Sequence, residues 1–206
     1  MKKVFYLLIS LLIIGSILSG CSPKTEYKRK IRHELASGVR NDSLFMGIYL
    51  GMPEKDFYTH CWKLNRKGLI KQGTTNTTVE YQTGDELKYP VTMDFYPSFV
   101  NGKISEMPVR FVYNGWAPWN KELTSDKLQV DVLNWYKRVY GHSFMEIEHP
   151  LKGIAYVNIS GNRRISIFKE DELHVWAVFT DMLVRKELSD SGKVVSNPVD
   201  NIKDLK

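Results

Sequence analysis

Apolar residues recur along this chain with two different periods, and the two periods alternate. A helical spacing of three to four residues runs through 53–66 and again through 126–140, so each segment presents one apolar face. Alternation of apolar and polar residues, which is typical of half-buried strands, marks the stretches after each helix. The expected strands are 77–83, 91–96, 103–113, 144–149, 153–159, 163–169 and 173–182.

Turn and capping residues separate these elements. Pro53 and Ser125 stand where the two helices begin, which is a common place for proline and serine. Asn101-Gly102 and Gly161-Asn162 are hairpin signals. Pro97 predicts that strand 91–96 ends there or lies at a sheet edge, where a partner could add a strand.

Three further segments carry weaker signals. Leu44–Tyr49 is an apolar, β-prone run and is expected to be a short strand. Met107-Pro108 is expected to break strand 103–113 into two parts, because proline lacks an N–H for the ladder. Residues 187–206 are polar and are expected to form a frayed tail.

The order of elements predicts the fold class. A helix followed by three strands, a linker, and a helix followed by four strands indicate an α+β protein. We expect one globular domain over 41–186, made of two units at about 45–113 and 125–182. In each unit a helix packs across an antiparallel meander, and the units form two layers.

The first 21 residues form a leader. Lys2 and Lys3 precede an apolar run over 4–18, which is too short to span a bilayer comfortably. Leu18-Ser19-Gly20-Cys21 follows and resembles the lipobox of bacterial lipoproteins. That resemblance implies a signal peptide over 1–20 and a palmitate-type lipid on Cys21. The alternative is an uncleaved N-terminal anchor.

Charge is concentrated beside the predicted lipid site. The chain carries a formal net charge of +6, of which Lys2 and Lys3 leave with the leader. The other four charges arise in 24–40, so 41–206 is balanced. We expect 21–40 to be a lipidated basic tether that attracts anionic headgroups, with a charged helix at 26–36 lying along a surface. Without a basic stripe in the folded part, no nucleic-acid partner is expected.

No side chains in the sequence assemble a recognised catalytic or metal motif. Cys61 lies on the apolar face of the first helix beside His60, but adjacent helical residues do not face each other. His142, Glu146 and Glu148 share one face of a strand, without a known metal spacing. We expect a non-enzyme with neither metal nor cofactor.

Aromatic and basic residues supply the remaining candidates. Trp116, Pro118 and Trp119 lie in the linker between the units, where they either anchor a partner, stack on a sugar or peptide, or close the core. Arg163 and Arg164 flank a predicted turn. They either hold an anion or, as we expect, form a solvated turn.

A second resemblance starts at Gly51-Met52, which opens the first helix. The pair and the element order are similar to small outer-membrane assembly lipoproteins and to β-lactamase-inhibitor-like domains. Those families begin the helix with Gly-Met-Thr, and here Pro53 replaces the threonine. The resemblance implies protein binding and envelope assembly, and it identifies no individual binding residue.

Three functions compete on this basis. The preferred one is a lipid-anchored outer-membrane protein that faces the periplasm and binds another protein without catalysis. The alternative is a carrier that holds a small lipid or glycan between helix and sheet, which requires a pocket of about 300 Å³ or more. A hydrolase of envelope polymers would require polar residues, for example Asp94, Glu146 and His174, to converge in one cleft.

Overall fold

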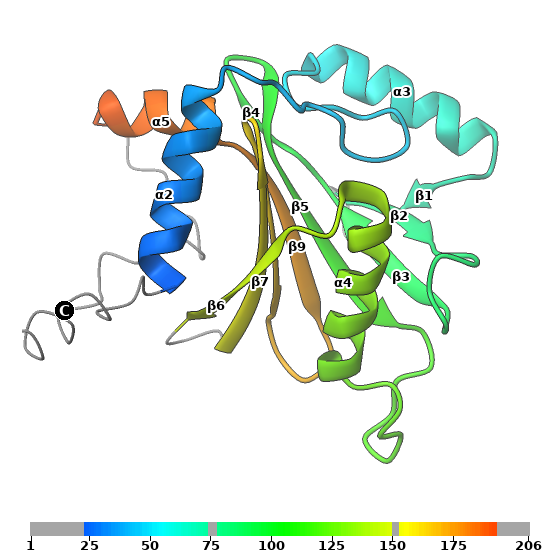
Figure 1. Cartoon of the computed structure of the whole chain (residues 1–206). Coiled ribbons are helices and arrows are strands. Elements are labelled where there is room, and N and C mark those ends of the chain that lie inside the picture. Colours follow the sequence, from blue (N-terminus) through cyan, green and yellow to red (C-terminus); the bar gives the residue numbers. More distant parts are fainter. Residues whose placement is uncertain (1–22, 74–77, 150–152, 193–206) are drawn as a thin grey trace, which may run out of the picture.

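The computed structural model shown in Figure 1 describes residues 23–73, 78–149 and 153–192. The chain is an α+β protein in which helices pack against one antiparallel sheet. The expected fold class is therefore confirmed. The predicted signal peptide and Cys21 lie outside the described residues.

Within the described residues the sheet has nine strands, and eight of them follow the order β1-β2-β3-β5-β9-β8-β7-β6, with β4 paired to β5. Every pairing is antiparallel. The strands are β1 Lys71–Gln72, β2 Val79–Gln82, β3 Val91–Phe95, β4 Ser98–Val100, β5 Lys103–Tyr113, β6 Phe144–His149, β7 Gly153–Ser160, β8 Arg163–Lys169 and β9 Val175–Asp181.

The strand order reflects two meanders joined side by side. Strands β1 to β5 form the first meander and β6 to β9 the second, and β5 pairs with β9 at the junction. There Met107 is opposite Phe179, and Phe111 is opposite Val175. The two expected units are thus halves of one continuous sheet.

Of the described helices, two lie on one side of this sheet and two on the other (Figure 1). We call the side that carries α3 and α4 the first face and the side that carries α2 the second face. A short α5 follows β9 directly. The helices are α2 Pro23–Ala36, α3 Glu54–Arg66, α4 Ser125–Tyr140 and α5 Met182–Asp190.

The first face holds the main hydrophobic core. From α4, Leu128, Val132 and Tyr136 are almost fully buried against the strands, and from α3, Phe57 is 1% exposed. Side chains of odd-numbered residues in β3 and β9 meet them, as the two-residue period of a strand requires. The predicted apolar faces of both helices are therefore confirmed at these positions.

Helix α2 packs against β6 and β7 on the second face. Tyr27 is 5% exposed, and Ile31 and Leu35 pack beside it on Val157 and Ile159. These three apolar residues, spaced by four, form the inner stripe of the helix. The expected surface-lying helix is confirmed, and from Pro23 on the predicted tether is part of the folded body.

The turn between β7 and β8 is locked by the chain that follows α2. The Gly161 N–H donates to Glu34, and the Asn162 side chain bonds both the N–H of Asn41 and the carboxylate of Asp42. Next to this turn, Arg163 is 7% exposed and Arg164 is 3% exposed. The expectation of a solvated turn at these arginines is wrong, because Ser43 and Tyr140 contact Arg163 and Tyr27 of α2 contacts Arg164.

The buried arginines have local partners. Arg163 donates to the Ser43 carbonyl and stacks over the ring of Tyr140, and burial lowers its pKa. Arg164 donates to the hydroxyl of Tyr27 at 3.0 Å, which links the strand to α2. Both side chains are buried in contacts that hold neighbouring segments together, so neither offers an open site for an anion.

Several predicted boundaries are wrong for identifiable reasons. Leu44–Tyr49 is a tight loop, because Met46 and Gly47 adopt positive φ angles of 51° and 79° and turn the chain back on itself. At the other end, residues 187–190 belong to α5. This helix begins because the Asp181 carboxylate accepts from the N–H of Leu183 at 3.0 Å.

The two predictions about prolines have different outcomes. Strand β3 ends at Phe95, just before Pro97, as one form of the prediction required. The edge alternative is wrong, because β3 pairs with β2 and with β5. The predicted break at Pro108 is wrong, because β5 continues through it. On one side of β5, pairing with β3 ends at Val109 and pairing with β4 begins at Glu106. Pro108 falls in the gap, where the missing N–H breaks no ladder bond on that side.

Within the described ranges, no helix is both long and apolar enough to cross a membrane.

Candidate functional site

The loop between β5 and α4 contains all three candidate binding residues. Trp116 and Pro118 line a cavity of about 690 Å³, which we call the Trp116 cleft. Trp116 also packs against the main core. Trp119 is 84% exposed, and its neighbours Pro118 and Asn120 both line the cleft.

The opposite walls of the cleft come from the start of α4 and the turn between β8 and β9. The N–H of Ser125 donates to the carbonyl of Glu172 at 3.2 Å, which ties these two segments together. The lining residues are Trp116, Ala117, Pro118, Asn120, Lys121, Thr124, Ser125, Asp126, Lys169, Glu170, Asp171 and Glu172.

Carboxylates outnumber cations around this cleft. Four acidic residues line it, and Lys121 and Lys169 are the two basic ones. Lys169 forms an ion pair with Asp126, and just outside the lining Lys127 pairs with Glu122 at 2.7 Å. The remaining acids therefore give the β8–β9 side of the cleft a negative potential.

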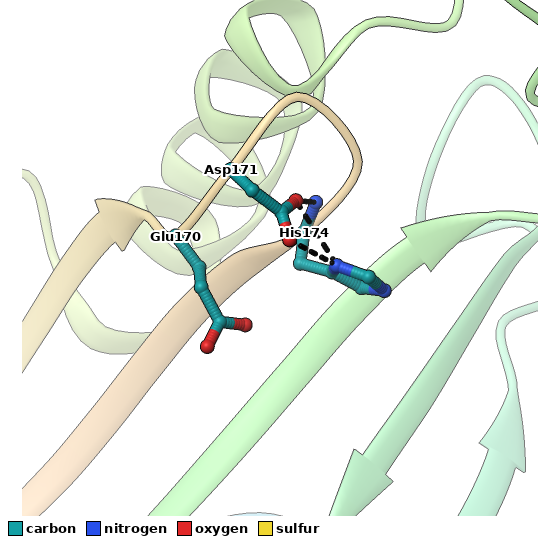
Figure 2. Close-up of side chains that lie close together, drawn as sticks. All are labelled: Glu170, Asp171 and His174. Carbon is teal, nitrogen blue, oxygen red and sulfur yellow. Dashed lines mark hydrogen bonds and ion pairs between the residues drawn. The ribbon is translucent and has the colours of Figure 1, made fainter.

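Three of the side chains near the β8–β9 turn lie close together (Figure 2). One ligand-type atom from each of Glu170, Asp171 and His174 lies within 4.8 Å of the others. Nδ1 of His174 is 2.8 Å from Oδ2 of Asp171 and 3.0 Å from Oδ1. Glu170 directly follows the last residue of β8, and His174 directly precedes the first residue of β9 (Figure 2).

The backbone of the turn orients Asp171. Its Oδ1 accepts the N–H of Leu173 at 2.8 Å and the N–H of His174 at 2.7 Å. Burial raises the pKa of Asp171, but the hydrogen bonds from the His174 ring and from these two amides outweigh burial and leave the pKa lowered. Asp171 is therefore held as a carboxylate beside the imidazole.

Other sets of residues considered in the sequence are not brought together. His142, Glu146 and Glu148 do not form a cluster, since the group at Glu170 is the only such set of three among the described residues. Of the set Asp94, Glu146 and His174, Glu146 lies on β6 at one edge of the sheet, and four strands separate β6 from β3.

Asp94 and His174 do influence each other. Burial and the nearby charge of Glu80 raise the pKa of Asp94, whereas Arg110 and His174 act in the opposite direction. The Asp94 side chain lines a small pocket of about 160 Å³ on the second face together with Arg110 and Trp176.

Cys61 and His60 point to different surroundings. The His60 ring lies 2.6 Å from the Met46 carbonyl, and Cys61 packs against the core. Burial raises the pKa of the Cys61 thiol to about 11, so the thiol is protonated at neutral pH. The interpretation of Cys61 as a small core residue agrees with this environment.

A second cavity of about 390 Å³ lies on the first face between α4, the 44–46 loop and the sheet. Most of its lining is aromatic or aliphatic. Tyr81 on its floor donates to Glu86 at 2.5 Å. The lining residues are Leu44, Phe45, Met46, Tyr81, Glu86, Met93, Trp135, Tyr136, Val139 and Tyr140.

A third hollow, of about 260 Å³, lies between α3 and the edge strand β1. Tyr58 and Trp62 line it and are 46% and 59% exposed. Arg66 stacks over the Trp62 ring. This surface is the second place where the described part of the chain exposes a tryptophan strongly.

Sequence patterns found the tryptophan loop but missed the acidic wall facing it. Asp171 and Glu172 lie between the predicted strands 163–169 and 173–182, and nothing local indicates that their turn meets the start of α4. The one usable signal was the spacing of Glu170, Asp171 and His174 around a single turn.

Comparisons with protein families, with curated proteins and with solved structures found no match to this chain.

Proposed function

We propose that this protein is a lipid-anchored module of the bacterial outer envelope that binds another protein through the Trp116 cleft, without catalysis. The observation that carries the proposal is Trp119. Its indole is 84% exposed on a loop whose neighbouring residues line a cavity of about 690 Å³. Leaving so large an apolar side chain in water is unfavourable, and tryptophan is enriched among residues that dominate binding energy.

The cleft combines the features of a protein-binding surface. Trp116 and Pro118 supply an apolar wall, and the carboxylates of Glu170 and Glu172 supply a charged one. An apolar centre with a polar rim is the usual composition of such interfaces. The charge sign supports a partner that presents basic residues next to an apolar side chain.

The anchor part of the proposal rests on the lipobox-like Leu18-Ser19-Gly20-Cys21. Cys21→Ala should remove the lipid mass from the purified chain and release the protein from envelope membranes. The matched control is Cys61→Ser, which should leave both the lipid mass and the fractionation unchanged. A Cys21→Ala protein that keeps its lipid mass would contradict the anchor.

Partner binding is tested by site-specific photo-crosslinking of the full chain in intact envelopes. A photoreactive residue at position 119 should give one discrete adduct. The same residue at position 62, the other strongly exposed tryptophan, should not. An adduct at 62 and none at 119 would move the interface to the α3 hollow and contradict the proposal.

The adduct then gives a partner for binding measurements. Trp119→Ala should weaken binding by about 30-fold, the size of a hot-spot contact, and Trp62→Ala by less than about threefold. Because Trp119 is exposed, its removal should change the free energy of unfolding by no more than about 0.5 kcal/mol. Equal binding by wild type and Trp119→Ala would refute the role of this residue.

A second candidate function is supported by the cavity of about 390 Å³ between α4 and the sheet. Its volume exceeds the size that a carrier requires, and its aromatic lining suits an apolar ligand such as a lipid chain. The test is mass spectrometry of compounds extracted from gently purified protein. A carrier should yield one compound in stoichiometric amount, and Val139→Trp, at the cavity wall, should reduce it. Protein that yields none would argue against a carrier.

A further inference from the structure

The β8–β9 turn presents a mixed set of metal-ligand atoms. Glu170, Asp171 and His174 each place one such atom within 4.8 Å of the others. They lie directly after β8, in the turn and directly before β9, so one short segment holds all three (Figure 2). Because strands β8 and β9 pair on either side of this turn, the backbone holds the three side chains at a constant spacing.

The chemistry of the three atoms favours a particular class of cation. One imidazole nitrogen with two carboxylate oxygens is a donor set that suits zinc and similar divalent transition metals. Calcium and magnesium prefer oxygen donors alone. Three protein donors also leave a coordination position, which water or a ligand in the Trp116 cleft can fill.

The carboxylate of Glu170 adds negative charge beside the Asp171–His174 pair. Asp171 accepts hydrogen bonds from two backbone amides and lies in hydrogen-bond contact with the His174 ring. The side chain of Glu170 is exposed to solvent, and one of its carboxylate oxygens lies within 4.8 Å of a ligand-type atom of each of the other two residues. Glu172 adds a further carboxylate on the cleft wall. A divalent cation would balance this local excess of negative charge.

We propose that Glu170, Asp171 and His174 bind a divalent cation of the zinc class at the wall of the Trp116 cleft. Nδ1 of His174 and Oδ2 of Asp171 share a hydrogen bond of 2.8 Å in the structure, and its proton is released to solvent when both atoms bind the ion. Glu170 is the third ligand. The backbone N–H groups of Leu173 and His174 hold the other oxygen of Asp171 and keep the carboxylate oriented. This site stands independently of whether the cleft binds a protein.

The test is calorimetric titration of Zn²⁺ into metal-stripped full-length protein in detergent. Wild type should bind one ion at this site. Both His174→Ala and Glu170→Gln should weaken binding by at least about tenfold, the usual effect of losing part of a coordination shell. Glu172→Gln removes a carboxylate from the same turn but outside the cluster, so it should bind within about twofold of wild type.

Two further measurements keep the result interpretable. A thermal melt of each variant shows whether it folds, and His174→Gln replaces His174→Ala if the latter melts early. Mg²⁺ in place of Zn²⁺ should give no saturable binding. Absence of Zn²⁺ binding in wild type would overturn the proposal. So would binding that His174 and Glu170 variants retain, because the ion would then lie elsewhere, for example at Cys61.

Discussion

The two faces of the sheet come from the same strands but differ sharply in chemistry. On the first face of β3, Val91, Met93 and Phe95 are each no more than 1% exposed beneath α3 and α4. On the second face of the same strand, Thr92 and Asp94 are polar and only partly buried. A single alternating segment therefore supplies both an apolar core and a charged surface.

The contrast extends across the strands. At one level of the second face, neighbouring strands place Glu80, Asp94, Arg110, Trp176 and Phe168 side by side in register. Charge at the first meander thus gives way to aromatic rings at the second. The comparison predicts that stability depends mostly on the first face, whereas the charged groups on the second face of the first meander contribute little to it.

The largest expected effect tests the first face. Phe179 is fully buried and its ring contacts Phe45, Tyr136 and Tyr140. Phe179→Ala should lower the free energy of unfolding by about 3–5 kcal/mol, because it removes buried area and leaves a cavity. The measurement is urea unfolding followed by fluorescence.

Trp176, three residues earlier on the second face of β9, is the matched control for this substitution. It is only partly buried, so Trp176→Ala should cost clearly less than Phe179→Ala even though tryptophan is the larger side chain. Equal losses would show that the second face contributes as much to stability as the first, and the comparison would fail.

A smaller effect concerns the helix on the second face. Glu34 accepts from Lys30 at 2.8 Å and from the N–H of Gly161 at 2.8 Å, and these bonds lower its pKa from the ordinary 4.5. The carboxylate therefore stabilises docking of α2 above pH 4.5, and this contribution is lost as the pH falls through the lowered pKa.

Glu34→Gln tests this dependence. At pH 7 the variant should lose about 1 kcal/mol, the usual value of such hydrogen bonds. Below the lowered pKa it should match wild type. Amide hydrogen exchange within α2, measured from pH 7 to pH 3, reports the docking directly. Parallel pH profiles for both proteins would exclude Glu34 as the acid-sensitive contact.

The smallest effect is expected at Asp94, and its sign is opposite. Burial and Glu80 raise the pKa of this carboxyl above 3.8, so its ionised form costs stability at neutral pH. Asp94→Asn should raise the free energy of unfolding at pH 7, by no more than about 0.5 kcal/mol because solvent screens the group. The gain should vanish below pH 3.8, as urea midpoints at both pH values will show.

Much of the fold was predictable because its signals are local. The bounds predicted for β6 and β8 match the structure, since each strand alternates cleanly and ends at a turn or a capping residue. The bounds of β5 also match, although its continuity through Pro108 does not. That continuity depends on which strand lies beside the proline, and no pattern within the segment specifies its neighbour.

The errors share this cause. Leu44–Tyr49 is apolar because it packs on the core as a loop, and composition alone does not distinguish a buried loop from a buried strand. The candidate site shows the same limit. The tryptophan loop was recognised from its residues, but its acidic wall exists only because the strand order brings the β8–β9 turn beside the start of α4.

Because α2 is packed on the sheet, it limits how far the folded domain can move from the membrane. Pro23 begins the helix two residues after Cys21, and two residues span at most about 7 Å. If Cys21 carries lipid as proposed, the short linker keeps the domain close to the membrane surface. The domain is then confined to a thin layer over the bilayer. A partner protein in the same membrane meets it at a high effective concentration, whereas a partner located elsewhere has to diffuse to this layer.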